Sequence, residues 1–149
     1  MIRNRTTVKR KPGLFLQPFV LAQLTGALIG EVVEGSDVTA AEYAVTSWIA
    51  IAGGITPSEV ADELGLAPTT LSAMIDRLVQ KKQVRRVRHP EDGRSYRLEL
   101  TARGRETNLR NARRLERLLG ELVENLEAEP ADVLESMGRL EAALRKTLA

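Results

Sequence analysis

The sequence predicts a mainly α-helical protein that carries one small β-hairpin. Apolar residues recur at helical spacing through most of the 149 residues, whereas strict alternation marks residues 95–100. Proline or threonine stands where each helix is expected to begin, and glycine stands where several are expected to end. Apolar residues make up 43% of the chain and charged residues 28%, which is the balance of a globular protein.

Six helices are expected, over residues 17–34, 39–52, 56–65, 68–82, 101–126 and 130–144. Thr39 and Thr56 each precede a helix and are followed three residues later by Glu, which is the capping-box pattern. Thr101 caps the long fifth helix. In the last two helices, apolar residues repeat at alternating spacings of three and four, a pattern typical of helices that pack along their length.

The hairpin is expected between the fourth and fifth helices. Residues 84–88 and 95–100 have the character of strands, and the connecting residues 89–94 are rich in turn formers. In the second strand Tyr96, Leu98 and Leu100 fall on one side.

The third and fourth helices have the spacing of a helix-turn-helix. Ala61 is small where the two helices would cross, and Gly65 can take the left-handed conformation that the turn requires. Because a basic hairpin follows at once, residues 56–101 predict a winged helix-turn-helix, a DNA-binding arrangement.

The net charge of +2 conceals a strongly uneven distribution. Residues 1–13 carry five basic side chains and no acidic one, and residues 14–76 carry eight acidic side chains and no Lys or Arg. Residues 77–105 carry ten basic side chains against three acidic ones. Such a concentration of positive charge favours a polyanionic partner over a merely solvated surface.

The fourth helix is expected to enter the major groove and to present its first residues to the bases. Its reading surface is short, and most of the positive charge lies at the helix end and on the wing, suited to phosphates and a minor groove. Asp92 is expected to steady the wing-tip residue Arg94. The residues expected to contact DNA are Thr69, Thr70, Ser72, Ala73, Arg77, Lys81, Arg86, Arg88, Arg94 and Arg97, with Arg85 in the same basic cluster.

These motifs resemble those of the MarR (multiple antibiotic resistance regulator) family. The resemblance rests on Thr56–Gly65, Leu71, Asp76–Leu78, Asp92–Arg94 and Leu98–Thr101. The pattern Leu-x-Leu-Thr-x-x-Gly, completed by Gly104, is particularly similar to the family's wing exit. The similarity extends from about residue 14 to the end of the chain.

The sequence departs from the family pattern near the end of the fourth helix and at the wing tip. Lys82 stands where such proteins usually have the glycine that ends the recognition helix, and Gln83 replaces an aliphatic residue. Gly93 stands where a second basic residue is common.

The resemblance implies a winged-helix dimer in which the first, fifth and sixth helices interlock. The corresponding domains are a basic N-terminal arm (1–13), a dimerisation helix (14–38), the winged helix-turn-helix (39–103) and two further dimerisation helices (104–149). The expected protein is a cytoplasmic homodimer that binds double-stranded DNA at a pseudo-palindromic operator and regulates transcription, most commonly as a repressor. Release by a small, aromatic ligand is the usual control in such families, and the candidate ligand contacts are Phe15, Phe19, Tyr43 and Trp48.

Several alternatives remain open. The helix-turn-helix can also serve as a protein-interaction adaptor without DNA affinity. Arg77 is either a DNA contact or a structural ion pair with Asp76, Asp62 or Glu63. The basic arm is either a DNA contact or a solubilising tail.

Other functional classes find no support in the sequence. There is no glycine-rich phosphate loop, nucleophile elbow or histidine–carboxylate constellation, so no enzyme activity or cofactor is expected. The chain has no cysteine and a single histidine, His89, so no metal site is expected either. The uncharged stretch 12–30 resembles a signal peptide or membrane anchor, but Pro18 and two glutamines interrupt it and a buried helix is the preferred interpretation.

Overall fold

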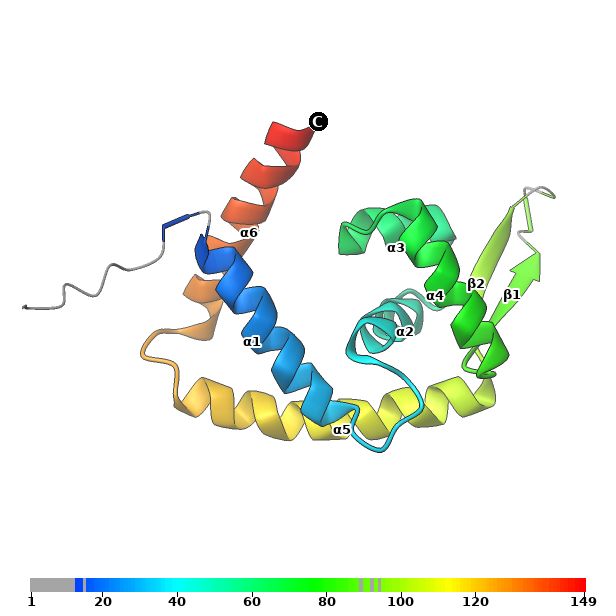
Figure 1. The fold of residues 1–149 in the computed structure, drawn as a ribbon, viewed down its shortest axis with the longest axis horizontal. Coiled ribbons are helices and arrows are strands. Elements are labelled where there is room, and N and C mark those ends of the chain that lie inside the picture. The colour runs from blue at the N-terminus through cyan, green and yellow to red at the C-terminus, as the bar shows by residue number, and fades with distance from the viewer. Residues whose placement is uncertain (1–12, 15, 89, 92, 94) are drawn as a thin grey trace, which may run out of the picture. The chain divides into compact units, whose positions relative to one another are not determined.

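The computed structural model describes residues 13–14, 16–88, 90–91, 93 and 95–149. Within this part of the chain, six helices and one antiparallel hairpin follow one another (Figure 1). In chain order they are α1 (Leu16–Val32), α2 (Ala40–Ala52), α3 (Pro57–Leu64), α4 (Pro68–Gln80), β1 (Val84–Arg88), β2 (Tyr96–Leu100), α5 (Ala102–Glu124) and α6 (Pro130–Leu148). The predicted fold class is confirmed.

Local signals determine where the helices begin. The Thr39 and Thr56 hydroxyls each accept a hydrogen bond from the backbone N–H three residues on, and the Glu carboxylate at that position accepts one from the threonine N–H. Both predicted capping boxes are therefore present. The Thr101 hydroxyl accepts from the Gly104 N–H at 3.0 Å and so caps α5 in the same manner.

The chain divides into two compact units, residues 1–109 and 110–149, and α5 crosses the division. The first unit holds the apolar core. It is built from α2, α3, α4 and the hairpin, with a short contribution from the end of α1 and the segment after it. The buried apolar residues are Val32, Val33, Val38, Tyr43, Val45, Ile49, Ile55, Val60, Ala61, Leu71, Ile75, Leu78, Val84, Leu98 and Leu100.

The hairpin is anchored to this core by one face. Val84, Arg86 and Arg88 of β1 lie opposite Leu100, Leu98 and Tyr96 of β2. Leu98 also exchanges backbone hydrogen bonds with Ile55, which joins the segment between α2 and α3 to the hairpin edge. Side chains alternate across a strand, so Arg86 and Arg88 share a face with the buried leucines while Arg85 and Arg97 point to the other face.

The end of α4 shows what the departure of Lys82 from the family pattern means for the backbone. The helix ends at Gln80, two residues earlier than expected, and Lys82 has a left-handed backbone with φ of +57°. The Gln83 N–H donates to the Leu78 carbonyl at 2.9 Å and the Lys82 N–H donates to the Val79 carbonyl at 3.0 Å. This is the Schellman arrangement, whose left-handed position favours glycine.

Gln83 is fully buried although it is polar. Its Nε2 donates to Asp37 Oδ1 at 2.7 Å and to Thr107 Oγ1 at 3.4 Å. The second Asp37 oxygen accepts from Arg103 Nη2 at 2.7 Å. One glutamine thus ties the segment before α2 to the first turns of α5.

The second unit consists of the later part of α5 and α6. Its apolar side chains stay largely exposed in the single chain, among them Leu134 at 68% and Met137 at 53%. None of the helices in the described ranges combines the length and the apolar character that crossing a membrane demands.

Candidate nucleic-acid interface

The first turns of α4 form an uncovered polar surface. Thr69, Thr70, Ser72 and Ala73 are all exposed, whereas Leu71 on the opposite side of the helix is buried. Ala67 is the N-cap and provides no side-chain hydrogen bond. The helix N-terminus therefore carries backbone N–H groups without a side-chain cap, next to the residues predicted to read bases.

Arg77 of α4 and Lys81, which caps the end of that helix, share one buried carboxylate. The Arg77 Nε donates to Glu42 Oε1 at 3.1 Å, and the Lys81 Nζ donates to Glu42 Oε2 at 2.6 Å. The Glu42 side chain is 1% exposed, whereas that of Arg77 is 51% exposed. Glu42 thus connects the start of α2 to the recognition helix.

Charge and burial act in opposite directions on this carboxylate. Burial alone raises the pKa of Glu42, but the hydrogen bonds from Lys81, the Thr39 backbone and Arg77 together outweigh burial and leave the pKa below its ordinary value. Glu42 is therefore ionised at neutral pH. The ion-pair partner of Arg77 is this residue, and not Asp76, Asp62 or Glu63 as the sequence suggested.

On another side of α4, the wing reaches back to the helix. Arg86 Nη2 donates to Asp76 Oδ1, and the Arg86 guanidinium lies 5.4 Å from the centre of the Tyr96 ring. Hydrogen bonds raise the pKa of Arg86, the one to Asp76 most and the one to Tyr96 next. Arg86 therefore stays protonated and positively charged. Arg86 is thus a link between the wing and α4 as well as a candidate phosphate contact.

The remaining predicted cations do not form a single cluster. Arg88 is exposed on the same hairpin face as Arg86. Arg97 lies on the other face, where its Cδ approaches Gly54 after α2. Arg85 also lies on that other face and pairs with Glu99 at 2.7 Å.

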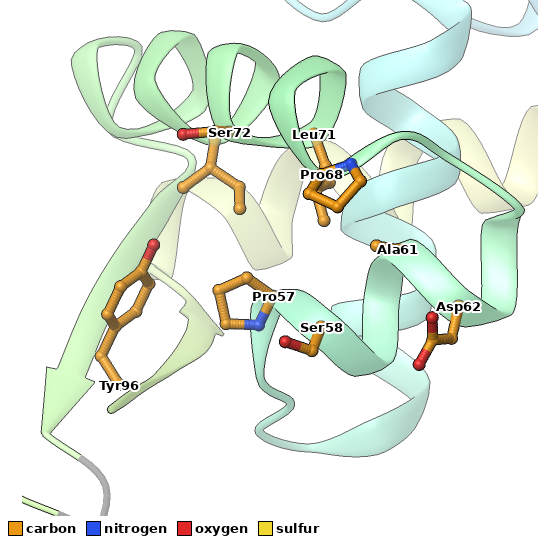
Figure 2. A pocket seen from close by; sticks show the side chains of 9 residues that line it. Pro57, Ser58, Ala61, Asp62, Pro68, Leu71, Ser72 and Tyr96 are labelled. Atoms are coloured by element: carbon orange, nitrogen blue, oxygen red, sulfur yellow. The ribbon is translucent and has the colours of Figure 1, made fainter. Parts of the chain in front are cut away.

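A hollow of about 270 Å³ opens between α3, α4 and β2. Figure 2 shows Tyr96 at one side, Pro57 and Ser58 of α3 below, and Ser72 of α4 above. Its walls also include Ala61, Asp62, Pro68, Leu71 and Ile75. Ser72, one of the residues predicted to contact DNA, thus lies at the edge of this hollow.

The predicted ligand contacts are not brought together around this hollow. Phe19 on α1 is 64% exposed, Tyr43 is buried in the core, and Trp48 is half-buried on α2. None of the three lines the hollow. In the described part of the chain, His, Asp and Glu side chains form no group that could hold a metal ion.

Several predicted residues lie outside the described residues. They are Phe15, His89, Asp92, Arg94 and the basic arm with Arg3, Arg5, Lys9, Arg10 and Lys11. The wing-tip contact of Arg94 and its support by Asp92 stay predictions.

Sequence reasoning identified Glu42 only as a helix cap. The signal for a second role was its position: the single acidic residue between Asp37 and Glu59 lies in a domain whose recognition helix has a cation pair four residues apart. The separation of 35 and 39 residues along the chain hid the pairing.

Comparison with known proteins points in one direction. A MarR family model matches residues 36–95. The curated Multiple antibiotic resistance protein MarR of Escherichia coli is 38% identical over 77 residues, which are 52% of this chain and 54% of that protein. In that sequence match the chain spans about half the length of its curated relative.

Solved structures match over nearly the whole chain. A mutant of E. coli MarR in complex with operator DNA is 31% identical, with 91% of this chain and 94% of that chain covered and a TM-score of 0.71. The apo form of wild-type E. coli MarR is 30% identical, with 94% of this chain and 100% of that chain covered and a TM-score of 0.70. The regulator BldR of Sulfolobus solfataricus has a TM-score of 0.73 at 19% identity over 87% of this chain and 94% of its own, a likeness of fold alone.

Proposed function

The chain belongs to the MarR family, and on this basis we propose that it is a transcription regulator that binds double-stranded DNA in a sequence-specific manner. The observation that carries the proposal is the surface of α4. Its exposed hydroxyl and methyl groups belong to Thr69, Thr70, Ser72 and Ala73. The same helix carries Arg77, and its Asp76 binds the wing arginine Arg86. Short polar groups are suited to base edges, and the flanking guanidinium groups are suited to phosphates.

Salt dependence separates DNA reading from the alternative of a protein-interaction adaptor. A duplex selected by the protein from a random-sequence pool serves as the specific probe, and the same duplex with shuffled bases serves as the non-specific one. The affinity for both should fall steeply as salt rises, with a log–log slope of roughly 0.9 per phosphate contact. If no sequence is enriched and neither duplex binds at low salt, the adaptor becomes the better explanation.

Two substitutions divide the proposed roles. Ser72→Ala should reduce the ratio of specific to non-specific affinity, because it removes a group facing the bases. Arg88→Ala should weaken both duplexes equally and reduce the salt slope by about one, because a phosphate contact carries no sequence information. If both variants changed the ratio of specific to non-specific affinity equally, the division into a base contact and a phosphate contact would be contradicted.

We also propose that the regulator acts as a homodimer on a pseudo-palindromic operator. The exposed apolar side chains of α6 support a second copy as the partner, because a monomer would leave Leu134, Met137 and Leu144 in water. Two recognition helices would then enter major grooves about one helical turn (~34 Å) apart.

Sedimentation equilibrium tests the dimer directly. Met137→Asp in α6 should shift the protein towards monomer, whereas Glu135→Gln, at an exposed charged position two residues away, should not. Truncation after Leu126 should give a monomer or an aggregate. A truncated protein that still binds DNA as a dimer would refute this role of α6.

For control, we propose repression that a small aromatic ligand relieves, acting in the cytoplasm. The family supports this form of regulation, and Phe19, Tyr43 and Trp48 remain the candidate contacts. Trp48 is the single tryptophan, so its fluorescence reports on its surroundings. Benzoic acid, taken as a simple aromatic acid, should change this fluorescence and release the selected duplex. An unchanged signal with undisturbed DNA binding would argue against this ligand class.

A further inference from the structure

We propose that Glu42 is a positioning residue for DNA recognition, which fixes the orientation of α4 and aims Arg77 at the DNA backbone. The inference rests on the proposed function and assigns to one buried residue of α2 a part in the selectivity of another helix. Glu42 itself would touch no DNA, because its side chain is 1% exposed.

The hydrogen bonds of Glu42 are what make it suitable for this role. Its Oε1 accepts from Arg77, and its Oε2 accepts from Lys81 at 2.6 Å and from the Thr39 backbone N–H at 2.9 Å. Each oxygen thus has a donor of fixed direction, and the Thr39 contact holds the carboxylate to the first turn of α2. Ionised acceptors form stronger and shorter hydrogen bonds than neutral ones, so the carboxylate resists displacement.

Arg77 and Lys81 are one helical turn apart and therefore lie on the same side of α4. Holding both to one point prevents α4 from rotating about its axis. Arg77 is held by Nε, the inner nitrogen of its guanidinium, while half of the side chain remains exposed. The outer nitrogens are thus presented to solvent in a limited set of directions, which lowers the entropy cost of a bidentate phosphate contact.

A second contact restrains α4 from a different side. Asp76 precedes Arg77, so its side chain projects about 100° away around the helix axis. It binds Arg86 of the wing. With Glu42 on one flank and Arg86 on the other, the exposed residues of the first turns have a defined orientation between them; these are Thr69, Thr70, Ser72 and Ala73.

A simpler role for Glu42 predicts the opposite effect on affinity. If the carboxylate only neutralised Arg77 and Lys81, its removal would free two cations and raise the affinity for every duplex. If it positions α4, its removal should lower the affinity for the selected duplex, because a mobile Arg77 and a less fixed reading surface must be ordered on binding.

The experiment compares Glu42→Gln with wild type on the selected duplex and on the shuffled one. Glu59→Gln is the matched control, because Glu59 completes the capping box of α3 in the same way but has an exposed side chain. Glu42→Gln should reduce the ratio of specific to non-specific affinity by about tenfold, the loss expected for one charge-assisted hydrogen bond. Glu59→Gln should leave the ratio as in wild type.

The same substitution in an Arg77→Met background shows whether Glu42 acts through Arg77. The loss of affinity that Glu42→Gln causes for both duplexes should vanish there, since the group to be positioned is absent. The loss in the ratio of specific to non-specific affinity should remain, because it comes from the orientation of Thr69, Thr70, Ser72 and Ala73. If Glu42→Gln does not fold, as circular dichroism would show, Glu42→Asp takes its place. This variant keeps the charge but shortens the reach to Arg77. Its ratio of specific to non-specific affinity should lie between those of wild type and Glu42→Gln.

Two results would overturn the inference. One is a folded Glu42 variant whose ratio of specific to non-specific affinity equals that of wild type. The other is a gain in affinity for both duplexes. Either outcome leaves the proposed function standing, because wild type still binds its selected duplex. Failure of wild type to select any duplex is a separate result that refutes DNA reading itself.

Discussion

The backbone of Gly104 lies directly against the carbonyl oxygen of Gln83. A Cβ atom at position 104 would come within 1.9 Å of that oxygen, and Gly104 is buried. Thr101 strengthens the same junction, because its hydroxyl donates to the Lys82 carbonyl and accepts from the Gly104 N–H. The closing glycine of the wing motif is therefore required by the close approach of two backbones.

Gly104→Ala should accordingly destabilise the fold. The neighbour is a backbone carbonyl held in the Schellman turn, so it cannot rotate aside as a side chain could. Overpacking at such a site costs about 1–3 kcal/mol, and the free energy of unfolding measured in urea should fall by about that amount. Gly120→Ala serves as the control, because a Cβ there meets nothing within 4 Å. Equal stability of the two variants would show that the junction can yield.

Lys82→Gly should stabilise the protein. Lys82 has a φ of +57°, a conformation that costs a residue with a Cβ about 1–2 kcal/mol and costs glycine nothing. Part of the gain is offset because glycine makes the unfolded chain more flexible, so a net increase of about 0.5–1 kcal/mol is expected. Thermal unfolding should show the corresponding rise in Tm. A fall in Tm would mean that the lysine side chain itself stabilises the turn.

Most of the fold could be predicted because its signals are local. Threonine caps and the alternation around Leu98 depend on neighbours within a few residues, and these elements were predicted closely. The two departures near the end of α4 were also visible in the sequence, but the reason for Gln83 was not. Gln83 is buried because Asp37 and Thr107 meet it from segments far along the chain.

The candidate site was less predictable for the same reason. The reading residues of α4 followed from helix spacing, whereas the partners of its charged residues depend on how α2 and the hairpin pack on it. For Arg77 the sequence leaves open a DNA contact or an ion pair with a nearby carboxylate, whereas its ion-pair partner Glu42 lies 35 residues away. The faces of the two strands likewise separate Arg97 from Arg86, although both belong to the basic segment 77–105.

Acid should expose the contribution of Glu42 to stability. Because its pKa is held below the ordinary value of 4.5, the carboxylate stabilises the fold above that pH, and this contribution is lost as pH falls through the lowered pKa. The free energy of unfolding of wild type should therefore fall more steeply in acid than that of Glu42→Gln. Unfolding in urea across a series of pH values measures this difference.

Lys81→Met provides the second arm of that measurement. Without the lysine hydrogen bond, burial is opposed by fewer hydrogen bonds and the pKa of Glu42 should rise towards its ordinary value. The loss of stability in acid should therefore be smaller than in wild type and should end at a higher pH. Identical acid profiles for Lys81→Met and wild type would show that Lys81 contributes nothing to the ionisation of Glu42.

Asp76→Asn should change DNA binding in the opposite sense to the loss of a basic residue. Asp76 holds Arg86 at the flank of α4 and places a negative charge beside the proposed phosphate contacts. Its neutralisation leaves Arg86 charged and free to bind phosphate, so the affinity for the shuffled duplex should rise and the salt slope should steepen by up to about one. The ratio of specific to non-specific affinity should fall, because α4 loses its link to the wing.

Glu99→Gln is the control for that measurement. It removes a carboxylate from an equivalent ion pair with Arg85, but on the hairpin face that points away from Arg86 and Arg88. Fluorescence anisotropy over a salt series should show little change in its slope compared with wild type. If Glu99→Gln steepens the slope as much as Asp76→Asn does, the gain reflects net charge alone, and Arg86 has no special place at the DNA backbone.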